Sequence, residues 1–142
     1  MTSDSNTIVR NYLITQTALT DLIINTDGSF RIYCPRLPEN TDLPAVSFFT
    51  RGGVSNPHIT KIVHPSIQFD CWANNPIEAR EVYCAIFWSL QGIQMVNVVV
   101  GGNTFSIMSA IEEVQGQDLV DVSIPNYFRV LTFFNMMIRV EN

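Results

Sequence analysis

Charge is scarce in this chain. Charged residues make up 15% of its 142 residues, where about 25% is usual for soluble domains. Eight basic residues stand against thirteen acidic ones, giving a net charge of −5, and Lys61 is the single lysine. A protein that grips DNA or RNA by its phosphates needs a basic cluster, so we do not expect stable nucleic-acid binding. Because a monomer needs charge to cover its surface, the deficit predicts that other chains cover part of it.

Cysteines and long apolar runs are also few. The three cysteines are Cys34, Cys71 and Cys84, and their odd number and unpaired spacing count against a disulfide framework. They predict reduced thiols, buried at Cys71 and Cys84. No run approaches the roughly 18 uninterrupted apolar residues of a membrane span, and the first ten residues lack the basic start and apolar core of a signal peptide. We therefore expect synthesis in the cytoplasm and no membrane partner.

Apolar residues, in contrast, are plentiful at 46% of the chain, which excludes a disordered protein. A chain of this length suits a single domain, residues 1–142. A domain of this size buries roughly 68–70% of the surface of its unfolded chain. It therefore needs neither a metal nor a disulfide to hold a core.

Helical spacing of apolar residues predicts two helices. The first spans about residues 5–24. The second begins after Asn75, which can cap it, with Glu78 three residues after the cap, and runs to about residue 91 before Gly92. The capping pattern makes this second start the clearest local signal in the sequence.

Strand-like runs fill most of the remaining chain, at residues 30–34, 45–51, 59–73, 94–100, 105–114 and 127–140. In the third run, Ile67, Phe69 and Cys71 alternate with Gln68, Asp70 and Trp72. The last run is apolar on both faces and so needs cover on both sides. The order of helices and strands predicts an α+β fold, a mostly antiparallel β-sheet with two α-helices packed on one face.

No group of residues points to catalysis or to a metal. His58 and His64 lie six residues apart without further ligands at zinc spacing, and no cysteine has basic neighbours that would lower its pKa. Glu112 and Glu113 are adjacent on an expected strand, so their side chains point to opposite faces. We therefore predict no catalytic residue, no cofactor-binding residue and no metal ligand.

Adjacent aromatic residues on strands carry a different signal. Within Phe48–Phe49 and within Phe133–Phe134, one ring of each pair must point away from the helices. The outward rings are candidates for an interface with another chain. The alternative is a second covering layer within the same subunit.

The layout resembles the tail terminator, or tail-completion, proteins of long-tailed (siphovirus-type) bacteriophages. The resemblance begins with the first helix, IVRNYLITQTALTDLI, and the proline-rich RIYCPRLPENTDLPAVSF. It is most specific in IQFDCWANNPIEAREVYCAIFWSL, where a strand ending in Asp-x-Trp runs into a capped helix. Asp70, Trp72, Glu78 and Ala79 occupy the family's positions, and the closing strand from about Arg129 also matches.

This resemblance implies a structural virion protein and not an enzyme. It implies a homo-oligomeric ring, typically a hexamer, that caps the tail tube, stops its polymerisation and joins the tail to the head-side connector. The implied partners are the tail tube protein, the connector and, in transient passage through the lumen, genomic DNA. The protein would be assembled in the host cytoplasm and reside in the neck of the virion. Two alternatives stay open: another neck component such as a head-tail stopper, and a small α+β ligand-binding or enzymatic domain.

Two groups of residues are candidates for these contacts. The closing strand supplies the candidate oligomer interface: Tyr127, Arg129, Leu131, Phe133, Phe134 and Met137. Two connections longer than the roughly 2–5 residues of a plain hairpin, 51–61 and 115–126, supply candidate partner-binding or lumen residues. These are Arg51, Asn56, His58, Lys61, Gln117, Asp118 and Asp121. The alternative for both connections is a tolerated surface insertion.

Overall fold

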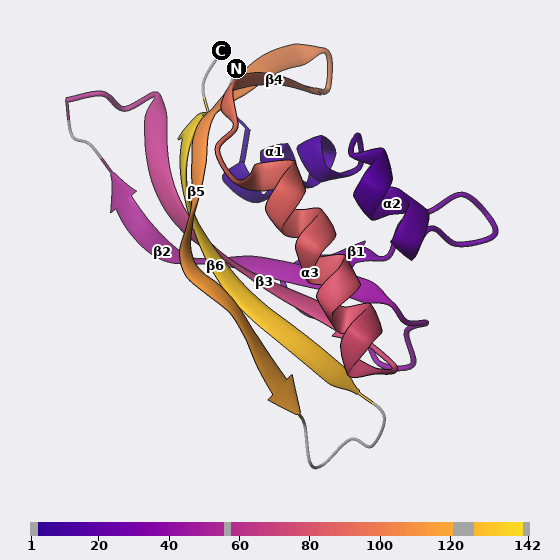
Figure 1. Ribbon diagram of the computed structural model, residues 1–142. Helices are drawn as coiled ribbons and strands as arrows, with labels where there is room; N and C mark the ends of the chain where they lie inside the picture. The colour runs from indigo at the N-terminus through magenta and orange to yellow at the C-terminus, as the bar shows by residue number, and fades with distance from the viewer. Residues whose placement is uncertain (1–2, 56–57, 121–126, 141–142) are drawn as a thin grey trace.

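The computed structural model describes residues 3–55, 58–120 and 127–140 (Figure 1). In this part of the chain there are three helices, α1 (Ser5–Leu13), α2 (Thr17–Ile23) and α3 (Pro76–Leu90). The strands are β1 (Ile32–Tyr33), β2 (Ala45–Ser55), β3 (Ile62–Ala73), β4 (Gln94–Val100), β5 (Asn103–Val120) and β6 (Phe128–Arg139). They form one sheet in the order β1-β2-β3-β6-β5-β4. Figure 1 shows that this sheet is curled and carries the helices on one of its faces.

The predicted combination of helices with a mostly antiparallel sheet is confirmed, but the number of helices is wrong. The helix count is three in place of two. The sheet is also mixed: β1 pairs with β2 in parallel, while the other four strand pairs are antiparallel. The parallel pair is only two residues long, because the proline-rich connection before β2 supplies little backbone that can pair.

The predicted helix over 5–24 is broken between Leu13 and Thr17. The hydroxyl of Thr15 donates a hydrogen bond to the Tyr12 carbonyl oxygen (2.6 Å), and the Thr15 amide donates to the same oxygen (3.1 Å). Gln16 then has extended backbone (φ −91°, ψ 99°). Threonine competes for backbone partners in this way and is a weak helix former, which ends α1. The break leaves α1 and α2 free to pack separately on the sheet.

The start of α3 forms as predicted from local sequence. The Asn75 side chain accepts a hydrogen bond from the Glu78 amide (2.8 Å) and donates one to the Glu78 carboxylate (3.2 Å), while Pro76 occupies the first turn. The first of these bonds satisfies one of the backbone amides that a helix start leaves open, and the second holds the capping side chain in place. The helix ends at Leu90, one residue before the predicted end.

Cys84 lies on the solvent-exposed side of α3 and not on the buried side, where it was predicted. The helix buries Ala79, Val82, Tyr83, Ile86 and Leu90 against the sheet. Cys84 is exposed, although a buried thiol was predicted; Cys71 in β3 is buried, as predicted. The reason is helical periodicity: position 84 shares its side of the helix with Ile77 and Trp88, which are 74% and 79% exposed.

Both long connections predicted from the sequence are partly strand. Residues 51–55 continue β2, and residues 115–120 continue β5. Irregularities in pairing make this possible, at 50–53 in β2 and at three points between 107 and 117 in β5. Polar residues at these positions are compatible with a strand that has one face open to water.

The core lies between the helices and the face of the sheet that they cover. Phe48 stacks on Phe69 with ring centroids 5.7 Å apart, and Phe69 meets Phe134 edge to face at 5.8 Å. All three rings are 0% exposed. Phe134 therefore cannot contact another chain in this fold, and the structure removes it from the predicted oligomer interface.

Candidate assembly surface

The opposite face of the sheet has no helix on it in the described part of the chain, and we call it the helix-free face. Odd-numbered residues of β6 point to it, and Arg129, Leu131, Phe133 and Met137 among them are half-buried. The even-numbered residues of β6 from Val130 to Ile138 are buried in the core. Alternation along a strand places these four predicted interface residues on one surface. Tyr127, just before β6, joins them through its contact with Trp72.

The centre of the helix-free face is a cluster around Phe133. The guanidinium carbon of Arg51 lies 3.8 Å from the Phe133 ring centroid. The same guanidinium forms an ion pair with the Glu113 carboxylate (2.9 Å) and donates to the Ser66 hydroxyl (3.1 Å). The Ser66 hydroxyl donates in turn to Glu113 (3.1 Å). Arg51, Ser66, Phe133 and Glu113 come from four neighbouring strands, so the cluster ties the sheet together across its width.

A second cluster surrounds Asp70, which is 5% exposed. The Arg129 guanidinium lies 3.7 Å from the Asp70 carboxylate, and the Gln68 amide donates to it at 3.2 Å. Burial raises the pKa of Asp70 above its usual value, and it outweighs Arg129 and Gln68, which act in the opposite direction. Asp70 is therefore a carboxylate held in the sheet at an electrostatic cost.

Trp72 extends this second cluster toward the end of the sheet. Its indole nitrogen donates to the Ser47 hydroxyl (2.9 Å), and its ring meets Tyr127 edge to face at 6.3 Å. The guanidinium carbon of Arg129 lies 5.1 Å from the Trp72 ring centroid. The indole is thus fixed by three neighbours while one side of it stays open to solvent.

This arrangement suits burial against another protein. Aromatic and arginine side chains are enriched at the centres of protein interfaces. Arg51 and Arg129 are each already held by an aromatic ring and a carboxylate. A partner that covers this surface would therefore lose little side-chain entropy there on binding.

The candidate loop residues do not gather at one place. Arg51 lies in β2, Lys61 immediately precedes β3, and His58 is exposed in the turn between them. Gln117 and Asp118 lie in β5, where Asp118 forms an ion pair with Arg80 of α3 (2.9 Å). Asn56 and Asp121 lie outside the described residues.

These two sets of loop residues are far apart along the sheet. Ile62, next to Lys61, pairs with Arg139, whereas Gln117 pairs with Leu131. Eight residues of β6 separate those two points, roughly 26 Å at strand spacing. Of the candidate loop residues that the structure describes, Arg51 alone contributes to the clusters on the helix-free face.

Sequence reasoning missed the polar partners that organise this surface. It placed Gln68, Asp70 and Trp72 on one face of a strand, but it did not pair Arg51 with Glu113 or Arg129 with Asp70. The register shows why: Trp72 lies opposite Arg129 across the β3–β6 pair, which joins residues far apart in the chain. The prediction that Glu112 and Glu113 point to opposite faces is confirmed, since Glu112 accepts from Tyr83 of α3 (2.7 Å).

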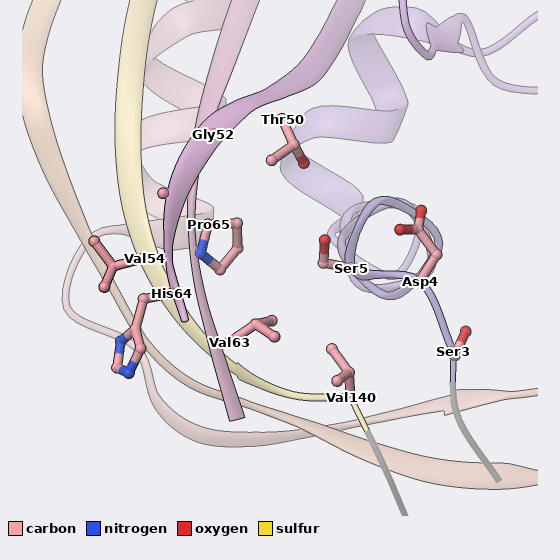
Figure 2. Close-up of a pocket in the computed structure, with 11 residues that line it drawn as sticks. Ser3, Asp4, Ser5, Thr50, Gly52, Val54, Val63, His64, Pro65 and Val140 are labelled. Atoms are coloured by element: carbon pink, nitrogen blue, oxygen red, sulfur yellow. The ribbon is translucent and has the colours of Figure 1, made fainter. Parts of the chain in front are cut away.

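A cavity of about 430 Å³ lies between the start of α1 and the β2–β3 hairpin, and Figure 2 shows the residues that line it. Ser3, Asp4 and Ser5 line one side, and Val63 and Pro65 line the other. His64 also borders the cavity, but Figure 2 shows its imidazole directed away from the serines. Among the described residues no hydrogen bond joins a serine hydroxyl there to His64.

Two further findings concern ligands and membranes. Within residues 3–55, 58–120 and 127–140, no group of three or more His, Cys, Asp or Glu side chains is placed to hold a metal ion. No helix in those ranges is long and apolar enough to cross a membrane. The absence of a cofactor, a metal and an enzymatic activity stays a prediction.

The helix-free face therefore offers a partner two clusters of aromatic rings, guanidinium groups and carboxylates, on a sheet face that no described helix covers. Comparison with known proteins finds no family model that matches this chain and no curated protein that is significantly similar to it.

Proposed function

We propose that this protein is a structural protein of the virion, a tail terminator of a long-tailed bacteriophage. In this proposal six copies form a ring that caps the tail tube, stops its polymerisation and joins the tail to the head-side connector. The observation that carries the proposal is the helix-free face, where Arg51 with Phe133 and Arg129 with Trp72 form a half-buried surface on a single chain. A neighbouring copy or a tail protein covers this surface in the assembled virion.

Charge and composition support the same function. A ring of six chains, each with a net charge of −5, carries −30. An acidic lumen repels the phosphate backbone, so genomic DNA passes through without being retained. The low share of charged residues also agrees with a surface that is largely covered in an assembly.

The test is to purify the protein and measure its mass by light scattering, with negative-stain images of the same sample. The expected result is a ring of about six subunits. Tails assembled without the protein should then be longer than normal and fail to join heads, and tails assembled with it should have the normal length.

Location distinguishes the proposal from its nearest alternative. A label on the protein should appear at the head-proximal end of tails that have not yet joined heads. A label found only on heads would instead identify a head-side stopper. A monomer that leaves tail length unchanged would contradict the proposal altogether.

A further inference from the structure

One part of the sheet edge is closed by a helix. Strand β4 pairs with β5 only as far as Ser109, so β5 continues with no strand on that side. There the Gln91 side chain, at the end of α3, accepts a hydrogen bond from the Glu112 amide (2.6 Å). The Tyr83 hydroxyl of α3 accepts another from the Gly116 amide (3.1 Å). Backbone groups that already have partners in this way are not available to a strand of another chain.

Strand β4, the last strand of the sheet, lacks such protection. Its sequence, QMVNVVV, contains neither a proline nor a charged residue. Edge strands of natural proteins usually carry one or the other, which discourages pairing with another chain. Among the described residues, one hydrogen bond from a helix reaches the outer edge of β4: the Asn11 side chain of α1 donates to the Val99 carbonyl oxygen at 3.4 Å. This is longer than the roughly 2.7–3.2 Å of an ordinary N–H···O bond.

The same bond shows which way the backbone of β4 points. In an antiparallel pair, the N–H and C=O of one residue point to the same side, and successive residues alternate toward and away from the neighbouring strand. Because the Val99 carbonyl faces Asn11, the backbone groups of Val99 and Asn97 both point away from β5. Apart from Asn11, no described residue supplies a partner for them. Met95 has a left-handed backbone (φ 51°), so the regular part of this edge is Val96–Val100.

We infer that Val96–Val100 pairs with the same segment of a second copy of this chain, antiparallel and centred on Val98. An edge with alternating outward N–H and C=O groups requires an extended strand as its partner. A second copy fits because the segment is its own complement: Val98 meets Val98, Val96 meets Val100, and Asn97 meets Val99. Each Asn97–Val99 pair then exchanges both of its backbone hydrogen bonds. No charge is brought against a like charge or into an apolar contact.

This contact goes beyond the proposed function. It uses the same patch on both chains and is therefore two-fold. A two-fold contact cannot build a ring in which all copies face the same way, so it is separate from the contact on the helix-free face. It doubles whichever assembly the chain forms: a ring becomes a pair of rings, and a single chain becomes a dimer.

A proline at position 97 tests the contact through its backbone. The mass of the wild-type protein, measured by sedimentation from about 1 μM to about 1 mM, should double with rising concentration. Asn97→Pro should raise the Kd of this doubling by about tenfold or more, because proline removes an outward N–H and leaves the bonds between β4 and β5 in place. Asn97→Ala is the matched control: it removes the side chain and its bond from Ser106 (3.1 Å) but keeps the N–H, so it should double as wild type does. Circular dichroism and urea unfolding check that both variants are folded.

A lysine at position 99 tests the same contact without proline. The Val99 side chain is 62% exposed, so Val99→Lys should leave the core unchanged. In the paired form the two lysines would lie diagonally across the contact, roughly 7–8 Å apart on one face, and their repulsion should prevent the doubling. Thr104→Lys is the matched control, because Thr104 is exposed and lies directly beside Val99 on β5, inside the sheet. It should double as wild type does.

The outcomes separate this inference from the proposed function. A wild-type mass that does not change with concentration overturns the contact, and so does doubling that persists in both Asn97→Pro and Val99→Lys. An equal loss of doubling in Asn97→Ala or Thr104→Lys also overturns it, because the effect would then not depend on the edge backbone. A ring that never doubles overturns this contact and leaves the ring standing. A single chain that doubles to a dimer supports the contact and contradicts the ring.

Discussion

The Arg51 guanidinium lies over the ring of Phe133, 3.8 Å from its centroid, and joins β2 to β6 on the face of the sheet that no described helix covers. Phe134, the next residue, is 0% exposed on the other face. Two adjacent phenylalanines therefore have separate roles: one closes the core, and the other belongs to a surface that we assign to assembly. This separation can be tested.

Phe133→Asp should abolish oligomer formation and leave the chain folded. The cost to the fold should be about 1 kcal/mol, because the ring is half-buried and its cation–π contact is partly exposed. Phe134→Asp should instead unfold the chain, with a loss of about 4 kcal/mol or more from a charge in the core. Light scattering and urea unfolding measure the two effects. Thr26→Asp, in an exposed turn, is the control for added charge and should assemble normally. Normal assembly of Phe133→Asp would show that the surface is not an interface.

Gly116→Ala should destabilise the protein by about 1–3 kcal/mol. A Cβ at this position would lie 2.6 Å from the Tyr83 ring, and the Gly116 amide donates to the Tyr83 hydroxyl (3.1 Å). The Gly116→Ala cost should shrink in a Tyr83→Ala background, since the ring is then absent. Urea unfolding of wild type, the two single variants and the double variant measures the coupling. Additive costs would mean that the backbone shifts to make room and that the contact is not tight.

Asp70→Asn should gain stability relative to wild type as the pH rises. Burial raises the pKa of Asp70 in the folded chain above its ordinary value of 3.8. The folded chain therefore keeps its proton at a pH where the unfolded chain has lost it. The stabilising effect of this raised pKa is complete below pH 3.8 and is lost as the pH rises through the folded value. Unfolding at about pH 3 and about pH 7 measures the change. A relative loss of stability for Asp70→Asn at neutral pH would mean that the ion pair with Arg129 outweighs burial.

Tyr83→Phe should change how the free energy of unfolding depends on pH above about pH 8. Burial, and next the hydrogen bond to Glu112, raises the pKa of Tyr83 from 10.0 to about 12. The unfolded chain loses this proton first, so the stability contribution is complete below pH 10 and is lost as the pH rises through about 12. The wild-type protein should therefore lose more stability than Tyr83→Phe between about pH 8 and about pH 11. Parallel curves for the two proteins would show that Tyr83 keeps an ordinary pKa.

The sequence by itself determined the elements that depend only on a few neighbouring residues. The start of α3 follows from Asn75, Pro76 and Glu78, because a capping side chain needs only the amides of the next turn. The strand at Gln94–Val100 forms with the predicted bounds, and the two-residue turn Gly101–Gly102 returns the chain into β5. Alternation along β6 likewise required that Phe133 and Phe134 point in opposite directions.

Tertiary structure decided what covers each face of β6. The odd positions include Arg129, Asn135 and Arg139, which favours the even face for the core, but only the fold brings Phe69 and the helices onto the face of Phe134. The break of the first helix near Thr15 and the extension of β5 to Val120 were decided in the same way, by packing and by a partner strand. The pairs Arg51–Glu113 and Arg129–Asp70 exist because strand register joins residues 62 and 59 positions apart in the chain. Sequence sets the periodicity of side chains along an element, but only the fold decides which distant residue each one meets.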